Sequence, residues 1–342
     1  MTAVYPRGRG TLGLRGSVPP LCWETSRSPD RVTGDQSIFE IAMPPGETAE
    51  VKLVRGDGTW AFGRNLVLVG GDDVKTHPCF DRQAGVVGAM ERLPSSSALA
   101  YRVYVPPSYD EQDAARYPVV YAQDGQALWR DGTDPFGVWA LEGILDGLFA
   151  LGAMREIIVV GIDTSERRIE RLSPVADRTH GGGEGPAHLD AIVEELKPAI
   201  DSRYRTRPKR DDTAVLGSSM GGLFSFFAAW TRPGVFGRAI CLSSSFWWAD
   251  RFTVRLVQAP TCPAPRPHLY LDSGASINPF ADDADERDGI HHTQAMSRAL
   301  LSHCFARGDD LHVLSFAGLR HDAASWAARV AVPLQLMFPR RT

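Results

Sequence analysis

The chain has 342 residues, of which 43% are hydrophobic and 23% charged, and its formal net charge is −4 at pH 7. This composition is typical of a globular protein with one large and one small domain. The mildly acidic balance, without a basic block, argues against a nucleic-acid partner. Because the apolar runs are too short for a membrane span and the first residues lack a signal-like hydrophobic segment, we expect a cytoplasmic protein without a membrane partner.

The five cysteines are scattered along the chain and form no Cys-x-x-Cys pair: Cys22, Cys79, Cys241, Cys262 and Cys304. In a reducing compartment they are expected to be free and mostly buried thiols, with a Cys22–Cys79 bridge as the alternative. No cysteines and histidines have zinc-ligand spacing, so we expect neither a metal nor another cofactor.

The N-terminal region carries short strand-like runs separated by turn-forming glycine, proline and aspartate. The expected strands are residues 12–15, 38–42, 50–54, 60–62 and 65–69. Strands at this spacing, without a helical stretch between them, are typical of a small antiparallel β-sandwich. We therefore predict an immunoglobulin-like sandwich over residues 1–81.

From residue 82 onward, apolar strands alternate with helical stretches. The expected strands are 100–105, 119–121, 157–162, 213–216, 268–271 and 311–316, and the expected helices are 139–151, 187–202, 222–230, 293–305 and 323–338. Strands that are apolar on both faces and alternate with helices indicate a mostly parallel sheet between two helical layers. The prediction for residues 82–342 is an α/β catalytic domain.

The most informative motif is Gly217-Ser-Ser219-Met-Gly221, which follows a β-prone run and precedes an apolar helical stretch. A nucleophilic serine on a tight strand-to-helix turn needs small residues two positions away on either side, because the neighbouring backbone crowds the turn. Ser219 is therefore the candidate nucleophile.

A serine hydroxyl needs a base within hydrogen-bond reach and a third group that orients the base. His321 is the candidate base, because it lies in a loop between the last expected strand and the last helix. The acid is less well defined, since several carboxylates crowd the loop after residue 274. Asp288, just before Gly289 and a helix, is favoured, with Asp283 and Asp285 as alternatives.

An oxyanion formed at such a serine needs two backbone N–H donors. Met220, directly after the nucleophile, is the first candidate. The second is Gln126, in the Asp124-Gly125-Gln126 turn that follows the strand at 119–121.

Several motifs in order resemble the enterochelin (siderophore) esterase branch of the putative-esterase family of α/β-hydrolases, over roughly residues 98–340. They are Asp124-Gly125-Gln126, Asp163-Thr164 with Arg168-x-Glu170, the Ser219 motif, Ser243-Ser-Ser-Phe-Trp247-Trp248, and His321-Asp322-Ala-x-x-Trp326. The resemblance implies an α/β-hydrolase fold and ester hydrolysis. It also implies that Gly125, Arg168, Glu170 and Trp247 contact or brace the substrate.

Two features depart from that branch. Its usual acid position, three residues after Gly274, is Ile277 here, and the N-terminal region looks unlike the N-terminal domain of siderophore esterases. The region is more similar to starch-binding-type carbohydrate-binding modules. That similarity implies glycan contacts at Trp23, Lys52, Trp60 and Asn65, where an exposed indole offers a flat apolar face to a sugar ring; interdomain packing by the two tryptophans is the alternative.

The sequence thus predicts a serine carboxylic-ester hydrolase that acts on a small-molecule ester, of either siderophore or acylated-sugar type. Two alternatives stay open: acyl transfer to a sugar or alcohol on the same fold, and an inactive glycan-binding protein.

Overall fold

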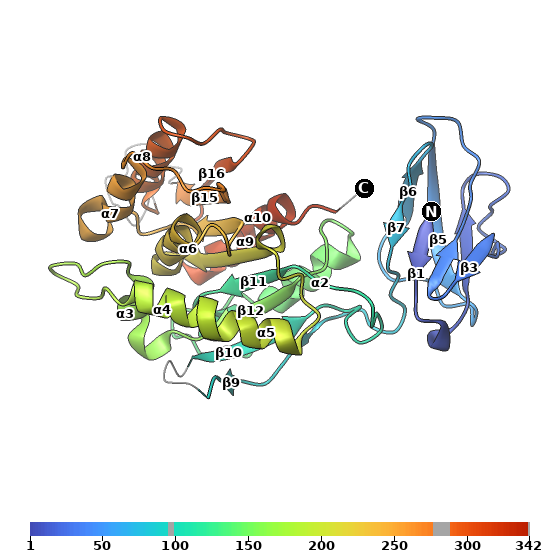
Figure 1. Ribbon diagram of the computed structural model, residues 1–342, viewed down its shortest axis with the longest axis horizontal. Helices are drawn as coiled ribbons and strands as arrows, with labels where there is room; N and C mark the ends of the chain where they lie inside the picture. The colour runs from blue at the N-terminus through green and yellow to red at the C-terminus, as the bar shows by residue number, and fades with distance from the viewer. Residues whose placement is uncertain (95–98, 276–287, 341–342) are drawn as a thin grey trace.

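The computed structural model describes residues 1–94, 99–275 and 288–340. The N-terminal strands lie at one end of the molecule, beside a larger body in which helices flank a sheet (Figure 1). The predicted boundary between residues 81 and 82 stays a prediction, although β8 (Val86–Val87) already pairs with the larger sheet.

The N-terminal strands form two sheets, ordered β3-β4-β1-β7 and β2-β5-β6. The first sheet comprises β1 (Thr2–Val4), β3 (Arg31–Thr33), β4 (Gln36–Ile38) and β7 (Lys75–Thr76), and the second β2 (Leu12–Gly16), β5 (Thr48–Arg55) and β6 (Leu66–Val69). Apolar side chains from both sheets, such as Ala3, Leu14 and Val51, share one buried core. The β-strands are present as predicted, but β1 pairs with β7 in parallel, which differs from the predicted antiparallel arrangement. The immunoglobulin-like sandwich stays a prediction.

The strand expected at residues 60–62 is wrong. Trp60 makes only an isolated bridge to Val54, and the backbone N–H of Phe62 donates to the carbonyl of Cys79. The Ala61 N–H still donates to the Leu53 carbonyl of β5, but the Phe62 N–H bonds the segment that leads into the larger body, so these residues form no regular strand.

The large sheet runs in the order β16-β15-β14-β13-β11-β12-β10-β8, with β9 paired to β10. Its further strands are β9 (Glu91–Arg92), β10 (Ala100–Val105), β11 (Val119–Ala122), β12 (Ile158–Ile162), β13 (Thr213–Ser218), β14 (Arg238–Leu242), β15 (His268–Ala275) and β16 (Leu311–Ala317). The strands from β16 to β12 are parallel, and β10 runs antiparallel to β12. This confirms the predicted α/β class and its six strands, while β14 went unpredicted.

Helices cover both faces of this sheet. They are α1 (Gly125–Leu128), α2 (Leu141–Ala150), α3 (Arg168–Leu172), α4 (Gly185–Ala191), the π-helical η3 (Ile192–Leu196), α5 (Lys197–Arg203), α6 (Met220–Thr231), α7 (Trp248–Val257), α8 (Ile290–Leu301), α9 (Ala323–Arg329) and α10 (Ala331–Met337). The helix expected at 323–338 is therefore two helices. Pro333 explains the break, because it has no N–H to bond the carbonyl of residue 329.

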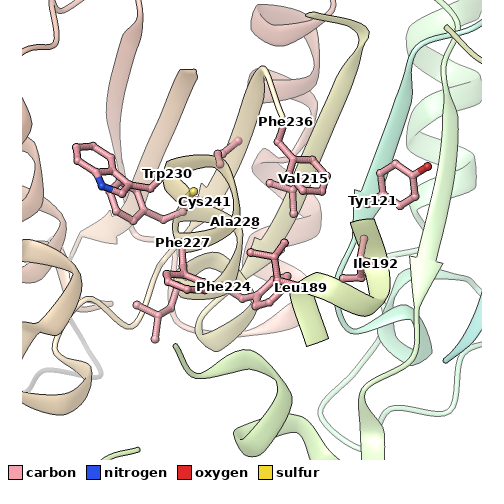
Figure 2. Close-up of a cluster of buried hydrophobic side chains, with 14 of the residues drawn as sticks. Tyr121, Leu189, Ile192, Val215, Phe224, Phe227, Ala228, Trp230, Phe236 and Cys241 are labelled. Carbon is pink, nitrogen blue, oxygen red and sulfur yellow. The ribbon is translucent and has the colours of Figure 1, made fainter. Parts of the chain in front are cut away.

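Alternation along the strands divides the core between the two faces. Val119 and Tyr121 of β11 face a cluster that includes α6 and α4, whereas Val120 and Ala122 face α2 and α10. Figure 2 shows the first cluster, where Phe224 and Phe227 of α6 lie with Leu189 of α4 and Val215 of β13. A sheet clamped on both sides holds its strand ends, and the residues they carry, in fixed positions.

A buried carboxylate joins the N-terminal strands to the larger body. Glu111, 3% exposed, accepts hydrogen bonds from the Tyr5 hydroxyl at 2.7 Å and from the backbone N–H groups of Phe80 and Asp81 at 2.8 and 2.9 Å. Arg55 lies 3.9 Å away. The contact between the two parts is thus polar and specific.

The expectation of five free cysteines is wrong. Cys262, in the loop between α7 and β15, is disulfide-bonded to Cys304, just beyond α8. Their Cα atoms lie 6.5 Å apart, because the end of α8 packs next to the start of β15. The alternative Cys22–Cys79 bridge is not formed, and both thiols are free.

Within residues 1–94, 99–275 and 288–340, no helix has the length and apolar character needed to cross a membrane.

Candidate active site

Ser219 lies at the junction between β13 and α6, in a backbone conformation that side chains rarely adopt. Its φ and ψ angles are 55° and −118°. A non-glycine residue in this region is strained, by about 1–3 kcal/mol, and persists only where its surroundings enforce it. The sharp turn lifts the hydroxyl out of the sheet, and Ser219 lines a cavity.

The glycines around Ser219 are required by close approach of the backbone. A Cβ on Gly217 would lie 2.4 Å from backbone atoms of Gly221, and one on Gly222 would lie 2.3 Å from the Ser244 hydroxyl oxygen. Both distances are shorter than any real Cβ contact. The spacing of the motif is therefore a packing requirement of this turn.

Three predicted side chains lie in one hydrogen-bonded row. His321 Nε2 lies 2.9 Å from Ser219 Oγ, and His321 Nδ1 lies 2.5 Å from Asp288 Oδ1. They come from three places: the start of α6, the loop after β16 and the residue pair before α8. Such a row lets the imidazole accept the serine proton while the carboxylate holds the other ring nitrogen.

The Asp288 carboxylate is fully buried and completely hydrogen-bonded. Its Oδ2 accepts from the Gly274 N–H at 2.6 Å, from the Ser243 hydroxyl and from Arg329 Nη2 at 3.0 Å. Burial raises the pKa of Asp288, but the hydrogen bonds from His321, Ser243 and Gly274 outweigh it and hold the pKa below its ordinary value. The group is therefore a carboxylate at neutral pH. Asp283 and Asp285 lie outside the described residues.

A second serine approaches the Ser219 hydroxyl. Ser245 Oγ lies 3.3 Å from Ser219 Oγ, and the Ser245 N–H donates to the Ser219 carbonyl at 3.0 Å. Sequence reasoning assigned it no role, although it belongs to the Ser243–Trp248 motif. The Ser245 hydroxyl can donate a hydrogen bond to Ser219 Oγ while Ser219 donates its own proton to His321 Nε2.

The two predicted oxyanion donors open neighbouring helices. Met220 is the first residue of α6 and Gln126 the second of α1, where backbone N–H groups have no partner within the helix. The helix starts touch, because a Cβ on Gly221 would lie 3.2 Å from Gln123 Cβ and 3.3 Å from Asp124 Oδ2. The Gln126 side chain lies elsewhere, with Nε2 3.3 Å from Asp134.

Arg168 pairs with Asp124 at the wall of the site. The guanidinium Nε and Nη2 each lie 2.9 Å from a different Asp124 oxygen, a bidentate pair. Both residues line the Ser219 cavity, whereas Glu170 of α3 does not border the described cavity. Gly125 has a packing role, because a Cβ there would lie 2.7 Å from the Gly161 backbone.

The cavity at Ser219 has a volume of about 560 Å³ and a largely apolar wall. It is lined by Asp124, Gln126, Ala127, Leu128, Thr133, Asp134, Pro135, Phe136, Gly137, Trp139, Arg168, Ser218, Ser219, His321, Asp322, Ala323 and Trp326. The Phe136 side chain is 87% exposed. A volume of this size can hold a drug-sized group beside the serine.

Trp247 lies apart from this cavity. Its indole is 39% exposed and packs against His180 and Trp248, with ring centroids 5.5 and 5.6 Å away. Of the four predicted substrate contacts, only Arg168 lines the described cavity at Ser219. Gly125, Glu170 and Trp247 do not line it.

Trp326, three positions before the end of α9, shapes the other side of the histidine. Its ring meets the His321 ring edge-on at 5.1 Å, and its Nε1 donates to Ser243 Oγ at 2.9 Å. It was part of a quoted motif, but no role followed from the sequence. Ser243 belongs to the Ser243–Trp248 motif but received no role of its own. Arg329 carried no local signal, because it reaches Ser243 and Asp288 only in the folded chain.

The four predicted glycan contacts line one shallow surface pocket, together with Glu50. The rings of Trp23 and Trp60 lie 6.4 Å apart, and the Arg15 guanidinium lies 4.8 Å from the Trp60 ring. Lys52 donates to the Gly63 carbonyl, and Asn65 donates to Glu50 at 3.0 Å. The pocket therefore offers indole surface beside polar groups that are already hydrogen-bonded.

One group of metal-ligating atoms is present among the described residues. The donor atoms of Cys262, His303 and Cys304 lie within 4.8 Å of one another. Both sulfurs are joined in the disulfide, so neither is available as a thiolate ligand.

Curated relatives match part of the chain. It is 29% identical over 156 residues to the YbbA protein of Bacillus subtilis, covering 44% of this chain and 58% of that one. It is 30% identical over 138 residues to the siderophore triacetylfusarinine C esterase of Aspergillus fumigatus, covering 38% and 45%. The matched segments thus span about half the length of these relatives.

Solved structures share the fold. A ferulic acid esterase aligns with a TM-score of 0.56 at 18% identity, covering 75% of this chain and 100% of that one. The siderophore hydrolase EstB of Aspergillus nidulans aligns with 0.54 at 22%, covering 73% and 94%.

The enterobactin esterase FES of Shigella flexneri aligns with a TM-score of 0.55 at 16% identity, covering 96% of this chain and 88% of that one. Because that coverage takes in the N-terminal strands, the likeness in fold extends to this region, while the expected difference in sequence from siderophore esterases stays a prediction. The shared feature is the fold of the region.

The sequence model of the Putative esterase family matches residues 96–335, a segment that contains the whole Ser219 site. The chain therefore belongs to the Putative esterase family.

Proposed function

We propose that the protein is a serine carboxylic-ester hydrolase with Ser219 as nucleophile, His321 as general base and Asp288 as the acid that orients it. The observation that carries this proposal is the unbroken row of hydrogen bonds, 2.5 Å from Asp288 to His321 and 2.9 Å from His321 to Ser219. Family membership supports the same chemistry.

In the proposed reaction, Ser219 Oγ attacks the ester carbonyl carbon while its proton passes to His321 Nε2. The carbonyl oxygen becomes an oxyanion, which the backbone N–H groups of Met220 and Gln126 stabilise. The C–O bond then breaks, and His321 returns the proton to the leaving alcohol. Water, deprotonated by His321, attacks the acyl-enzyme and releases the acid and Ser219.

The cavity wall supports an ester with a bulky aromatic group. Trp139 and Trp326 lie with ring centroids 6.2 Å apart, and Phe136 and Leu128 extend the apolar surface. Such a wall stabilises an aromatic ring by burial and by offset or edge contacts. A relative named as an endo-1,4-beta-xylanase/feruloyl esterase and a structural neighbour named as a ferulic acid esterase agree with this choice. The substrate proposed is an aromatic ester of siderophore or acylated-sugar type.

The decisive experiment is hydrolysis of a p-nitrophenyl ester panel, from acetate to aromatic acyl groups, by the wild type and Ser219→Ala. We expect turnover by the wild type and its loss in the variant. Labelling of Ser219 by a fluorophosphonate, blocked by candidate esters, then ranks substrates. A wild type that turns over no ester in a broad panel would contradict the assignment.

We propose a second function for the N-terminal strands, recognition of a glycan at Trp23, Lys52, Trp60 and Asn65. The observation that favours it is that all four residues line a single surface pocket with two neighbouring indoles. Retention on immobilised amylose or xylan tests it. We expect Trp60→Ala to abolish retention without changing ester turnover; equal retention of both proteins would contradict the proposal.

A cytoplasmic location stays part of the proposal, and one observation weighs against it. The Cys262–Cys304 disulfide is of a kind that is uncommon in reducing compartments. Thiol titration of protein taken directly from its source tests this. Free Cys262 and Cys304 would agree with a cytoplasmic location, and an intact disulfide would argue against it.

A further inference from the structure

Arg329, the last residue of α9, is a buried cation between two buried carboxylates. Its exposure is 1%, and the side chains of Asp272 and Asp288 are fully buried. Nη2 lies 3.0 Å from Asp288 Oδ2, and Nε lies 3.2 Å from Asp272 Oδ2. Buried charges are costly unless they are paired, so the three groups depend on one another.

Ser243 closes this cluster at its centre. Its hydroxyl donates to Asp288 Oδ2 and accepts from Arg329 Nη2 and from Trp326 Nε1. Its backbone N–H lies 3.3 Å from Asp272 Oδ1. Asp288 Oδ2 is thus held by hydrogen bonds inside the protein, and Oδ1 is the oxygen that contacts His321.

The charges of the cluster contribute to the electrostatic field at His321. Asp288 and Asp272 each carry one negative charge and Arg329 one positive charge, so His321 faces a net charge of −1. Without Asp272 the net charge would be zero, and without Arg329 it would be −2. A more negative surrounding stabilises the imidazolium, and a less negative one destabilises it.

We propose that Arg329 and Asp272 are positioning residues for the His321–Asp288 pair. Arg329 fixes the Asp288 carboxylate, and Asp272 balances the charge of Arg329 so that Asp288 still stabilises the imidazolium. The proposal rests on the proposed esterase function and goes beyond it, because neither residue touches the substrate or the reacting atoms.

Asp272 carries its negative charge at neutral pH and loses it in mild acid. Burial raises its pKa to about 6, against the lowering effects of Arg329, the Tyr270 hydroxyl and the Ser243 N–H. The other titratable groups of the described cluster are Asp288 before α8, His321 before α9, Tyr270 on β15 and the Cys241 thiol on β14. Protonation of Asp272 in mild acid would therefore leave Arg329 opposed by Asp288 alone.

The test is the pH profile of kcat/KM on a p-nitrophenyl ester for Asp272→Asn, Arg329→Gln and the double variant. The acidic limb reports protonation of the base in the free enzyme. We expect Asp272→Asn to move this limb to lower pH and Arg329→Gln to move it to higher pH, each by roughly 0.5–1 unit, below the ~1–3 units of a direct charged neighbour. The double variant restores a net charge of −1 and should return the limb close to its wild-type position.

Arg329→Gln should also lower kcat by roughly 10–100-fold with a smaller change in KM, the loss expected for one hydrogen bond to a charged group. Arg155→Gln is the matched control, because Arg155 pairs with Asp212 at 3.1 Å in the same body, with side chains 14% and 15% exposed. It should lower stability and leave the limb in place.

If Arg329→Gln fails to fold, Asp272→Asn and the double variant still test the charge balance. Limbs that coincide in every folded variant, or single variants that shift in the same direction, would overturn the proposal. Loss of turnover in Ser219→Ala tests the esterase function separately. That loss can be observed even if the proposed roles of Arg329 and Asp272 are wrong.

Discussion

His321 and Asp288 share a hydrogen bond of 2.5 Å between Nδ1 and Oδ1. Asp288 reaches this position with a left-handed backbone, φ 47°, next to Gly289 at φ 62°. The turn places the carboxylate at the start of α8 and beneath the imidazole. The first two predictions concern this row of side chains.

Ser219→Ala should lower kcat for a p-nitrophenyl ester by at least about 10⁴-fold, because no other oxygen is hydrogen-bonded to His321 Nε2 in the described part of the chain. Ser225→Ala is the matched control. Ser225 lies on the same helix, is fully buried and bonds only the Gly221 carbonyl. Comparable activity in the two variants would contradict a nucleophilic role for Ser219.

Asp288→Asn should lower kcat by roughly 10³–10⁴-fold with little change in KM, because an amide cannot stabilise the imidazolium and favours the wrong tautomer. Asp283→Asn and Asp285→Asn are the comparison variants and should retain wild-type kcat. A large loss of kcat in either comparison variant, with Asp288→Asn still active, would assign the acid role to Asp283 or Asp285 instead.

Phe136→Ala should raise KM for an aromatic acyl ester by about tenfold and leave KM for the acetate ester nearly unchanged. The physical reason is the apolar area that an aromatic group buries against this ring, worth about 1–2 kcal/mol. Leu151→Ala, an exposed apolar residue away from the cavity, is the control. An equal KM change for both esters would argue against ring contact.

Reduction of the Cys262–Cys304 disulfide should destabilise the protein by about 2–4 kcal/mol, because the bond closes a loop of 42 positions in the unfolded chain. Urea unfolding with and without a phosphine reductant measures the difference. The double variant Cys262→Ser/Cys304→Ser should be less stable and insensitive to the reductant. A reductant effect that persists in the variant would assign the loss to another cause.

Glu156→Gln should make the protein more stable at pH 8 than the wild type and change little at pH 4. Burial raises the pKa of Glu156 to about 7, against the hydrogen bonds from Ser108. The protonated carboxyl therefore favours the folded state most at low pH, and this contribution is lost as pH rises from about 4.5 through 7. Urea unfolding at both pH values should show a gain of roughly 1–3 kcal/mol at pH 8. Glu47→Gln, at an exposed site, should show none.

Most of the helices and strands could be predicted from local sequence patterns. The apolar runs at β11, β12 and β13 are buried on both faces, so their residues had to be hydrophobic and β-prone throughout. β14, with the charged Arg238 at its start and Cys241 within it, was not predicted. At residues 323–338 one helix was predicted where the structure has two. The apolar run continues through Pro333, but proline has no N–H for the helical hydrogen bond.

The residues of the candidate site also fall into those that local sequence identifies and those that only the folded structure brings together. Ser219 and His321 could be selected because a glycine-flanked turn and a loop after a strand leave local marks. Asp288 could only be favoured, since its neighbours in the loop are chemically identical. Arg329 and Asp272 could not be found at all, because 57 positions separate them and their ion pair exists only in the folded chain.

The Glu111 carboxylate at the contact with the N-terminal strands has a practical meaning for the larger body of the protein. A shortened protein that begins at residue 82 would keep every residue of the Ser219 row, yet it would lose the Tyr5 hydroxyl and the Phe80 and Asp81 amides that solvate this carboxylate in place of water. The larger body therefore depends on the N-terminal region for the hydrogen bonds of Glu111. Without that region, we expect it to be less stable.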